Sequence, residues 1–271
     1  MRSKKSAAAR VSSLPILGLI GFLLLSDTAA NAADHWLAVD GMDCAVWSDQ
    51  PLSPGEVLVW TGGCEEGRLS GQGILEVSGA GSVDSLRFEG VMHGGKADGE
   101  GILRSSEQGG ETSYRGRFAD SLFDGYGVLE LADGSHYEGG FKADQPDGYG
   151  IYRGADGSLF QGALSGGEPQ GEGFEITADG AKYQGEFARG ARHGKGTLLF
   201  ADGGIYEGGF ADGKADGGGI YTDPAGDVFE GTWKNGKADG EFLVTQADGT
   251  TEKQVWRNDR QVTTDDNGGK Q

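Results

Sequence analysis

The chain has 271 residues, 53 of them glycine, and its 42 acidic and 23 basic residues give a formal net charge of −19. This balance argues against nucleic-acid binding, because proteins of that class neutralise phosphates with Lys and Arg. It also disfavours binding to anionic bilayers, which attract basic segments. Glycine is present at about three times its usual share of roughly 7%, which indicates either a low-complexity chain or a regular repeat.

Residues 1–32 are predicted to be a signal peptide. A basic head from Arg2 to Arg10 precedes an apolar run from Leu14 to Leu25, and Ala30-Asn31-Ala32 has the small-x-small pattern of a cleavage site. The apolar run is shorter than the roughly 20 residues of a membrane-spanning helix. We therefore expect an exported protein, periplasmic or extracellular, that is cleaved after this site. An uncleaved signal that anchors the chain in the membrane is the alternative.

Residues 33–59 lack the repeat that follows them and are predicted to form an N-terminal cap, because a stack of repeats otherwise ends in an exposed apolar edge. The two cysteines of the chain are Cys44, in this segment, and Cys64, just after it. In an exported protein we expect them to form a disulfide, and closing a loop of about 20 residues contributes about 3 kcal/mol. A metal-binding or redox pair is the alternative, but the two residues lack CxxC spacing.

From Trp60 onward one pattern recurs, and each copy begins at an aromatic residue that we number position 0. These residues are Trp60, Phe88, Tyr114, Tyr137, Phe160, Tyr183, Tyr206 and Phe229, and the last six are spaced 23 residues apart. Position 2 is always glycine, at Gly62, Gly90, Gly116, Gly139, Gly162, Gly185, Gly208 and Gly231. Position 11 is glycine in every copy as well. A fixed period of this kind indicates a repeat architecture, here of eight copies.

Each copy is predicted to contribute a β-hairpin. Positions 0, 2 and 4 are aromatic, glycine and apolar, whereas position 1 is largely polar, and this alternation indicates a half-buried strand with position 1 toward solvent. The glycine between two large side chains leaves a hollow on the buried face that a neighbouring aromatic side chain could fill. The second strand is predicted to begin at position 11, after a polar bend such as residues 212–216, and to end at an Asp-Gly turn.

An aromatic residue followed by Gly at positions 2, 7, 11 and 13 and by a closing Asp-Gly, at a period of 23 residues, resembles the MORN repeat. The resemblance covers residues 60–251. It implies an all-β fold, an elongated single-sheet antiparallel meander of β-hairpin repeats with the disulfide-linked segment as its cap. We place the array at residues 60–258, with insertions within 78–85 and 105–113, and expect residues 259–271 to be a disordered tail.

No catalytic or cofactor-binding set of residues is recognisable in the sequence. The histidines are His35, His93, His136 and His193, and they occur singly in different units. A row of aspartates at position 10, namely Asp98, Asp124, Asp147, Asp216 and Asp239, makes calcium binding the alternative to plain surface carboxylates. Repeats about 10 Å apart would keep two such side chains from sharing an ion whose ligands lie at about 2.3 to 2.6 Å. We therefore predict no enzyme activity, no cofactor and no metal.

The resemblance implies scaffolding and protein contacts, which include self-association, and in some family members binding of lipid headgroups. We predict a non-enzymatic interaction or scaffold module of the cell envelope that binds a protein partner, a second copy of the chain included. The alternative is binding of membrane-lipid headgroups by the array. The acidic charge weakens that alternative, and basic residues such as Arg115, Lys142 and Lys234 are spread over several repeats without forming a stripe.

Overall fold

The computed structural model describes residues 35–48, 52, 54–79, 85–107 and 110–262. The predicted signal peptide, parts of both insertions and residues 263–271 lie outside this range. Within it the chain forms 21 strands and no helix, in open, mostly antiparallel sheet, which confirms the all-β prediction. Accordingly, no helix suited to crossing a membrane occurs in these ranges.

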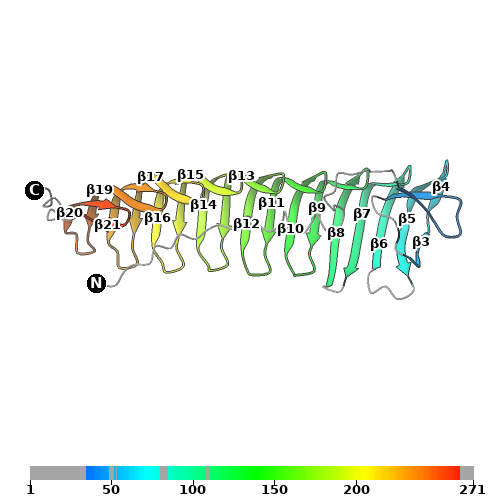
Figure 1. Cartoon of the computed structure of the whole chain (residues 1–271), viewed down its shortest axis with the longest axis horizontal. Coiled ribbons are helices and arrows are strands. Elements are labelled where there is room, and N and C mark those ends of the chain that lie inside the picture. The colour runs from blue at the N-terminus through cyan, green and yellow to red at the C-terminus, as the bar shows by residue number, and fades with distance from the viewer. Residues whose placement is uncertain (1–34, 49–51, 53, 80–84, 108–109, 263–271) are drawn as a thin grey trace, which may run out of the picture. The chain divides into compact units, whose positions relative to one another are not determined.

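The chain divides into two compact units. Their strands are labelled in Figure 1. The N-terminal unit contains the described residues up to Ala155 and Leu164–Gly167. Its strands are β1 (His35–Ala38), β2 (Ala45–Ser48), β3 (Glu56–Trp60), β4 (Gly63–Glu65), β5 (Arg68–Gly79), β6 (Ser85–His93), β7 (Lys96–Glu107), β8 (Gly110–Ala119), β9 (Leu122–Glu130), β10 (His136–Lys142) and β11 (Gln145–Arg153). Strand β12 (Leu159–Ser165) contributes residues to both units.

The C-terminal unit contains Asp156–Ala163 and the described residues from Glu168 onward. Its strands are β13 (Glu168–Ile176), β14 (Lys182–Ala188), β15 (Ala191–Leu199), β16 (Ile205–Ala211), β17 (Lys214–Thr222), β18 (Val228–Lys234), β19 (Lys237–Thr245), β20 (Thr251–Arg257) and β21 (Arg260–Gln261). Strands β13 to β20 form an antiparallel meander in which each strand pairs with the next. Strands β5 to β11 of the N-terminal unit pair in the same way.

The hairpin turns are tighter than the sequence predicted. In every copy the residues at positions 6 and 7 both have positive φ, for example Gly166 (56°) with Gly167 (81°) and Asn235 (50°) with Gly236 (79°). Two consecutive residues with positive φ are typical of the two-residue type I′ hairpin turn, whose twist matches that of the flanking strands. The prediction that the second strand begins at position 11 was therefore wrong, since β17, for example, already begins at Lys214, position 8.

The glycine at position 11 lies inside the second strand and has positive φ in all copies, from 57° at Gly194 to 137° at Gly240. A residue with a Cβ atom rarely adopts this conformation, which explains why the position is always glycine. On the first strand the register shifts between positions 2 and 4, as between Gly208 and Phe210. These two irregularities interrupt the regular pairing, and they explain why the second strand does not alternate cleanly between polar and apolar residues.

Successive hairpins are also joined at their turns. The backbone N–H at position 7 donates a hydrogen bond to the position 9 carbonyl of the preceding repeat, as from Gly213 to Arg192 (2.9 Å) and from Asp144 to Phe123 (3.0 Å). Two copies lack glycine at position 7, and in one of them the residue is Asp144. Its carboxylate also accepts a hydrogen bond from the buried Phe123 N–H (2.7 Å). The other is Ser121, whose hydroxyl accepts one from Ala97 N–H (3.1 Å).

The Asp144→Ala variant is expected to lower the free energy of unfolding by about 2 to 3 kcal/mol, because it leaves the buried Phe123 N–H without its side-chain acceptor. Asp144→Ser is the matched control, since Ser121 makes the equivalent bond one repeat earlier, and it should lose less than about 1 kcal/mol. Urea denaturation followed by circular dichroism measures both. Equal losses for the two variants would show that the side-chain hydrogen bond is not the source of stability.

The aromatic side chains at positions 0 and 4 form a large part of the core of each unit. Tyr183 is fully buried, and its ring meets Phe187 and Phe210 edge-on at centroid distances of 5.2 and 4.9 Å. Each position 0 tyrosine donates its hydroxyl to the carbonyl three residues on, as from Tyr183 to Glu186 (2.9 Å) and from Tyr206 to Gly209 (3.1 Å). Burial raises the pKa of Tyr206 to about 12, so this hydroxyl keeps its proton at neutral pH.

The hollow left by the position 2 glycine is filled by the aromatic side chain of the same strand. A Cβ atom on Gly185 would lie 2.6 Å from the Tyr183 hydroxyl and 2.6 Å from the Cα atom of Gly196. Gly185 pairs with Gly173 on one side and Gly196 on the other, so glycines of neighbouring strands lie in one row. The tyrosine ring lies over this row because none of its members has a side chain.

The N-terminal cap is linked to the first copy by the Cys44–Cys64 disulfide, which confirms the predicted pairing. Strand β2 also pairs with β5 in parallel, at Ala45 and Arg68. At the other end, Arg260 and Gln261 form β21, which pairs with β20. These two residues fall within the predicted disordered tail, and they are ordered because Asn258 and Asp259 make one more hairpin turn with positive φ.

Candidate functional site

A groove of about 1350 Å³ runs across the strands of the C-terminal unit, on the face opposite the buried aromatics. Its floor includes five glycines of the aligned row: Gly185, Gly196, Gly208, Gly219 and Gly231. Because the missing side chains of this row would point toward the buried aromatic rings, the opposite face presents bare backbone. The predicted position 2 glycines therefore contribute to the site as well as to the core.

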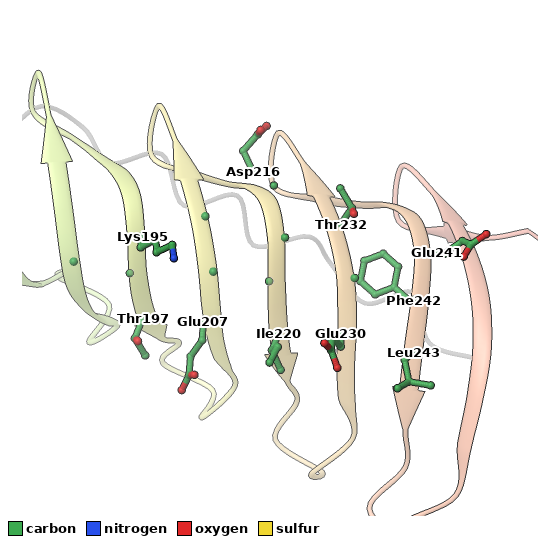
Figure 2. A pocket seen from close by; sticks show the side chains of 18 of the residues that line it. Lys195, Thr197, Glu207, Asp216, Ile220, Glu230, Thr232, Glu241, Phe242 and Leu243 are labelled. Atoms are coloured by element: carbon green, nitrogen blue, oxygen red, sulfur yellow. The ribbon is translucent and has the colours of Figure 1, made fainter.

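One wall of the groove is a cross-strand row of side chains from positions 1 and 14. Figure 2 shows Thr197, Glu207, Ile220, Glu230 and Leu243 in this row. The register places them side by side, since Glu207 pairs with both Thr197 and Ile220, and Glu230 pairs with both Ile220 and Leu243. These positions alternate with the buried ones along each strand, so their side chains project to the outer face.

The other wall is formed by residues at positions 3 and 12, among them Lys195, Thr232 and Glu241 (Figure 2). Between Lys195 and Thr232 this wall contains Gly209 and Gly218, which have no side chains. The wall is therefore low in the middle of the groove, opposite the exposed side chain of Ile220. Asp216 lies above the gap, near a hairpin turn.

The groove carries more negative than positive charge. Its lining contains five carboxylates, namely Glu172, Glu207, Asp216, Glu230 and Glu241, against the two amines of Lys195 and Lys253. Asp216 accepts a hydrogen bond from the Asn235 N–H (3.0 Å). Among the described residues, the exposed carboxylates of Glu207 and Glu230 have no ion-pair or hydrogen-bond partner. They are thus available to a ligand.

A buried ion pair lies on the other side of the same sheet, in the core. Arg192 is 2% exposed, and its Nε donates to the Glu175 carboxylate at 2.8 Å. Glu175 occupies position 15, which is Leu129 and Leu198 in other copies, and Arg192 occupies position 9, where the first copy has Leu69. Within the described part of the chain the Arg192 Nη2 atom has no hydrogen-bond partner. The sequence signal for this pair is a charged residue at an otherwise apolar position of the repeat.

The position 0 aromatics predicted for the core lie inside it. Seven of the eight are at most 5% exposed, from Trp60 to Tyr206, whereas Phe229 is only partly buried. In that last copy position 13 is Phe242 instead of glycine, and the Phe242 ring occupies the place next to Gly231 that the position 0 ring takes in other copies. Position 13 is glycine in the other seven copies, and the effect of Phe242 on Phe229 was not predicted.

The histidines and the aspartate row are dispersed. His93 and His193 are exposed, and His136 lies 4.0 Å from the Glu130 carboxylate. In the aspartate row, Asp147 accepts a hydrogen bond from the Gly166 N–H of the following hairpin turn (3.3 Å), as Asp216 does from Asn235. These contacts give two members of the row a structural role. Across the described residues, no three His, Cys, Asp or Glu side chains are close enough together to hold a metal ion.

The fold and the groove define a repeat protein, in which equivalent positions of successive hairpins lie side by side on the outer face of the sheet. The family model of the MORN repeat matches residues 88–109, 114–136, 137–159, 160–182, 183–205, 206–228 and 229–241. These seven segments cover more than half of the chain, which therefore belongs to the MORN-repeat family. The copy predicted at Trp60 is not among the matched segments.

Two solved structures that match the chain are TCP domains. The SAS-4 (dCPAP) TCP domain of Drosophila melanogaster, in complex with a proline-rich motif of Ana2, has a TM-score of 0.34 and 10% identity over 57% of this chain and 84% of that domain. The TCP10 domain of Danio rerio CPAP has a TM-score of 0.35 and 13% identity over 76% and 94%. No curated protein matches the chain.

Proposed function

We propose that this chain is an exported, non-enzymatic scaffold module of the cell envelope that binds a protein partner through the groove of its C-terminal unit. The observation that supports the proposal is the groove itself, in which two rows of side chains recur from repeat to repeat over a bare glycine floor. Binding surfaces of repeat proteins are built in this way, from equivalent positions of successive units. The basic start and apolar run of residues 1–32 support export.

We also assign residues from Trp60 onward as an eighth repeat. The Trp60 indole N–H donates to the carbonyl of Gly63, three residues on (2.9 Å), as the position 0 tyrosines do. Gly67 and Gly71 have the positive φ of positions 7 and 11. This copy therefore follows the conformational rules of the others, although it carries the disulfide cysteine at position 4.

The proposed function is tested with the exported protein immobilised as bait in envelope extract. We expect Ile220→Lys, in the middle of the groove, to abolish capture of a protein that the unmodified bait retains, because a buried amine in an interface loses its hydration. Val57→Lys in β3 is the matched control, since Val57 is 44% exposed and Ile220 is 40% exposed, and it should capture the same protein.

The capture experiment and a vesicle experiment together decide between a protein partner and lipid headgroups. Capture that is unaffected by Ile220→Lys, or absent from all baits, would contradict the groove as the binding site. Sedimentation with anionic vesicles at physiological salt is expected to leave the protein in the supernatant, since like charges repel over a Debye length of about 8 Å. Robust pelleting would favour lipid-headgroup binding over a protein partner.

A further inference from the structure

We infer that the groove binds an extended, positively charged peptide segment that lies across the strands and carries two cationic side chains three residues apart. This inference rests on the proposed function, which requires only that a protein binds in the groove. It adds the chemistry and the conformation of the bound segment. Three features of the groove carry it: its direction, its charge and the spacing of its free carboxylates.

The direction follows from the register. Glu207, Ile220 and Glu230 belong to three consecutive strands and face one another in the pairing. The wall that they form therefore runs perpendicular to the strands, as Figure 2 shows. A ligand in the groove lies across the sheet and contacts one side chain of the wall from each strand that it passes. A segment that added to the sheet as one more strand would instead run parallel to these strands.

The charge selects a cationic ligand. Glu207 and Glu230 are exposed and face the groove, and no described residue neutralises either of them. Ile220 lies between them and Leu243 beyond them, with exposures of 40% and 42%. The wall thus alternates carboxylate and aliphatic side chains. A segment that places a cation against each carboxylate and an apolar group against each aliphatic side chain complements this wall.

The spacing selects the conformation. Glu207 and Glu230 occupy the same position in successive repeats, two strands apart, which corresponds to about 9.6 Å. Side chains three residues apart in a polyproline II segment lie on the same side and are about 9.3 Å apart. Side chains on one side of a β-strand recur every two residues, at about 6.8 Å, and two turns of an α-helix advance about 10.8 Å. Of these three conformations, polyproline II has the side-chain spacing closest to the distance between Glu207 and Glu230.

The experiment uses three fluorescent peptides of equal length and composition, each with two arginines, which stand three, two or seven residues apart. Fluorescence anisotropy at physiological salt should show the tightest binding for the first peptide. The double variant Glu207→Gln/Glu230→Gln should weaken its binding by about fivefold, as expected for loss of two exposed ion pairs. Glu65→Gln/Glu100→Gln removes the same charge from exposed sites of the N-terminal unit, outside the groove, and should change the affinity by less than about twofold.

Several outcomes overturn the inference. Equal weakening by the two double variants would show attraction to the net charge of the protein instead of binding in the groove. Tighter binding of the peptide with arginines two residues apart would indicate that the bound segment is a β-strand. Tighter binding of the peptide with arginines seven residues apart would indicate an α-helix. Failure of all three peptides to bind, while Ile220→Lys still abolishes capture of a protein, would remove the cationic ligand and leave the proposed function standing.

Discussion

Glu175→Leu is expected to lower the free energy of unfolding by about 3 to 5 kcal/mol, the range for a buried charge that loses its partner. Arg192 is 2% exposed, and Glu175 accepts its Nε hydrogen bond at 2.8 Å. Without the carboxylate the guanidinium stays in the core with the Tyr183 ring beside it, 5.1 Å from the guanidinium carbon. Urea denaturation of the protein, followed by circular dichroism, measures the loss.

The matched control is the double variant Glu175→Leu/Arg192→Leu. Both positions are leucine in other copies, at Leu198 and Leu69, so the double variant should regain most of the stability that the single variant loses. A buried ion pair replaced by apolar residues of similar size is often neutral or stabilising. If the double variant is no more stable than Glu175→Leu, the loss arises from packing around position 15 and the charge is not responsible.

Gly185→Val is expected to lower the free energy of unfolding by about 3 kcal/mol, at the upper end for overpacking of a core. A Cβ atom at this position would lie 2.5 Å from the carbonyl oxygen of Lys195 and 2.6 Å from the Gly196 Cα atom. Both atoms belong to the backbone of the paired strand, so neither can rotate away. The strands must separate or the Tyr183 ring must leave its place, and either change disturbs the neighbouring repeats.

The control for this variant is Gln184→Val on the adjacent, exposed position, which should change stability by no more than about 0.5 kcal/mol. Hydrogen exchange supplies a second readout, because repeats are stabilised mainly by their nearest neighbours. In Gly185→Val we expect faster exchange around Phe160 and Tyr206 than near Cys44. If Gln184→Val lowers the free energy of unfolding more than Gly185→Val does, position 1 contributes to the core. The face that carries the groove would then be the buried one.

Much of the fold could be predicted because it depends on short-range patterns. The alternation of Tyr183, Gly185 and Phe187 with polar residues correctly predicted which side of β14 is buried. The closing Asp-Gly dipeptides form turns in which, for example, the Asp133 carboxylate accepts the Ser135 N–H (2.8 Å). The disulfide followed from there being only two cysteines. Each of these inferences needs residues close in sequence, or a pairing without alternatives.

The start of the second strand and the positive φ at position 11 could not be predicted in the same way. Glycine is compatible with a bend, a bulge or a close backbone approach, and the sequence does not distinguish these. Glycines at different positions of the repeat therefore have two different structural roles. Position 2 glycines such as Gly185 make room for a ring, whereas position 11 glycines such as Gly194 allow a backbone conformation.

The sequence by itself determined the repeat, its β-hairpins, the buried aromatic face and the disulfide-linked cap, because a strict period repeats the same local preferences in every copy. Only the tertiary structure decided which residues from different repeats meet. The groove wall of Glu207, Ile220 and Glu230 depends on the register between strands. The pairing of Arg192 with Glu175 depends on a contact across 17 residues. Register is set by turn geometry and bulges acting together, and these form only when neighbouring hairpins pack.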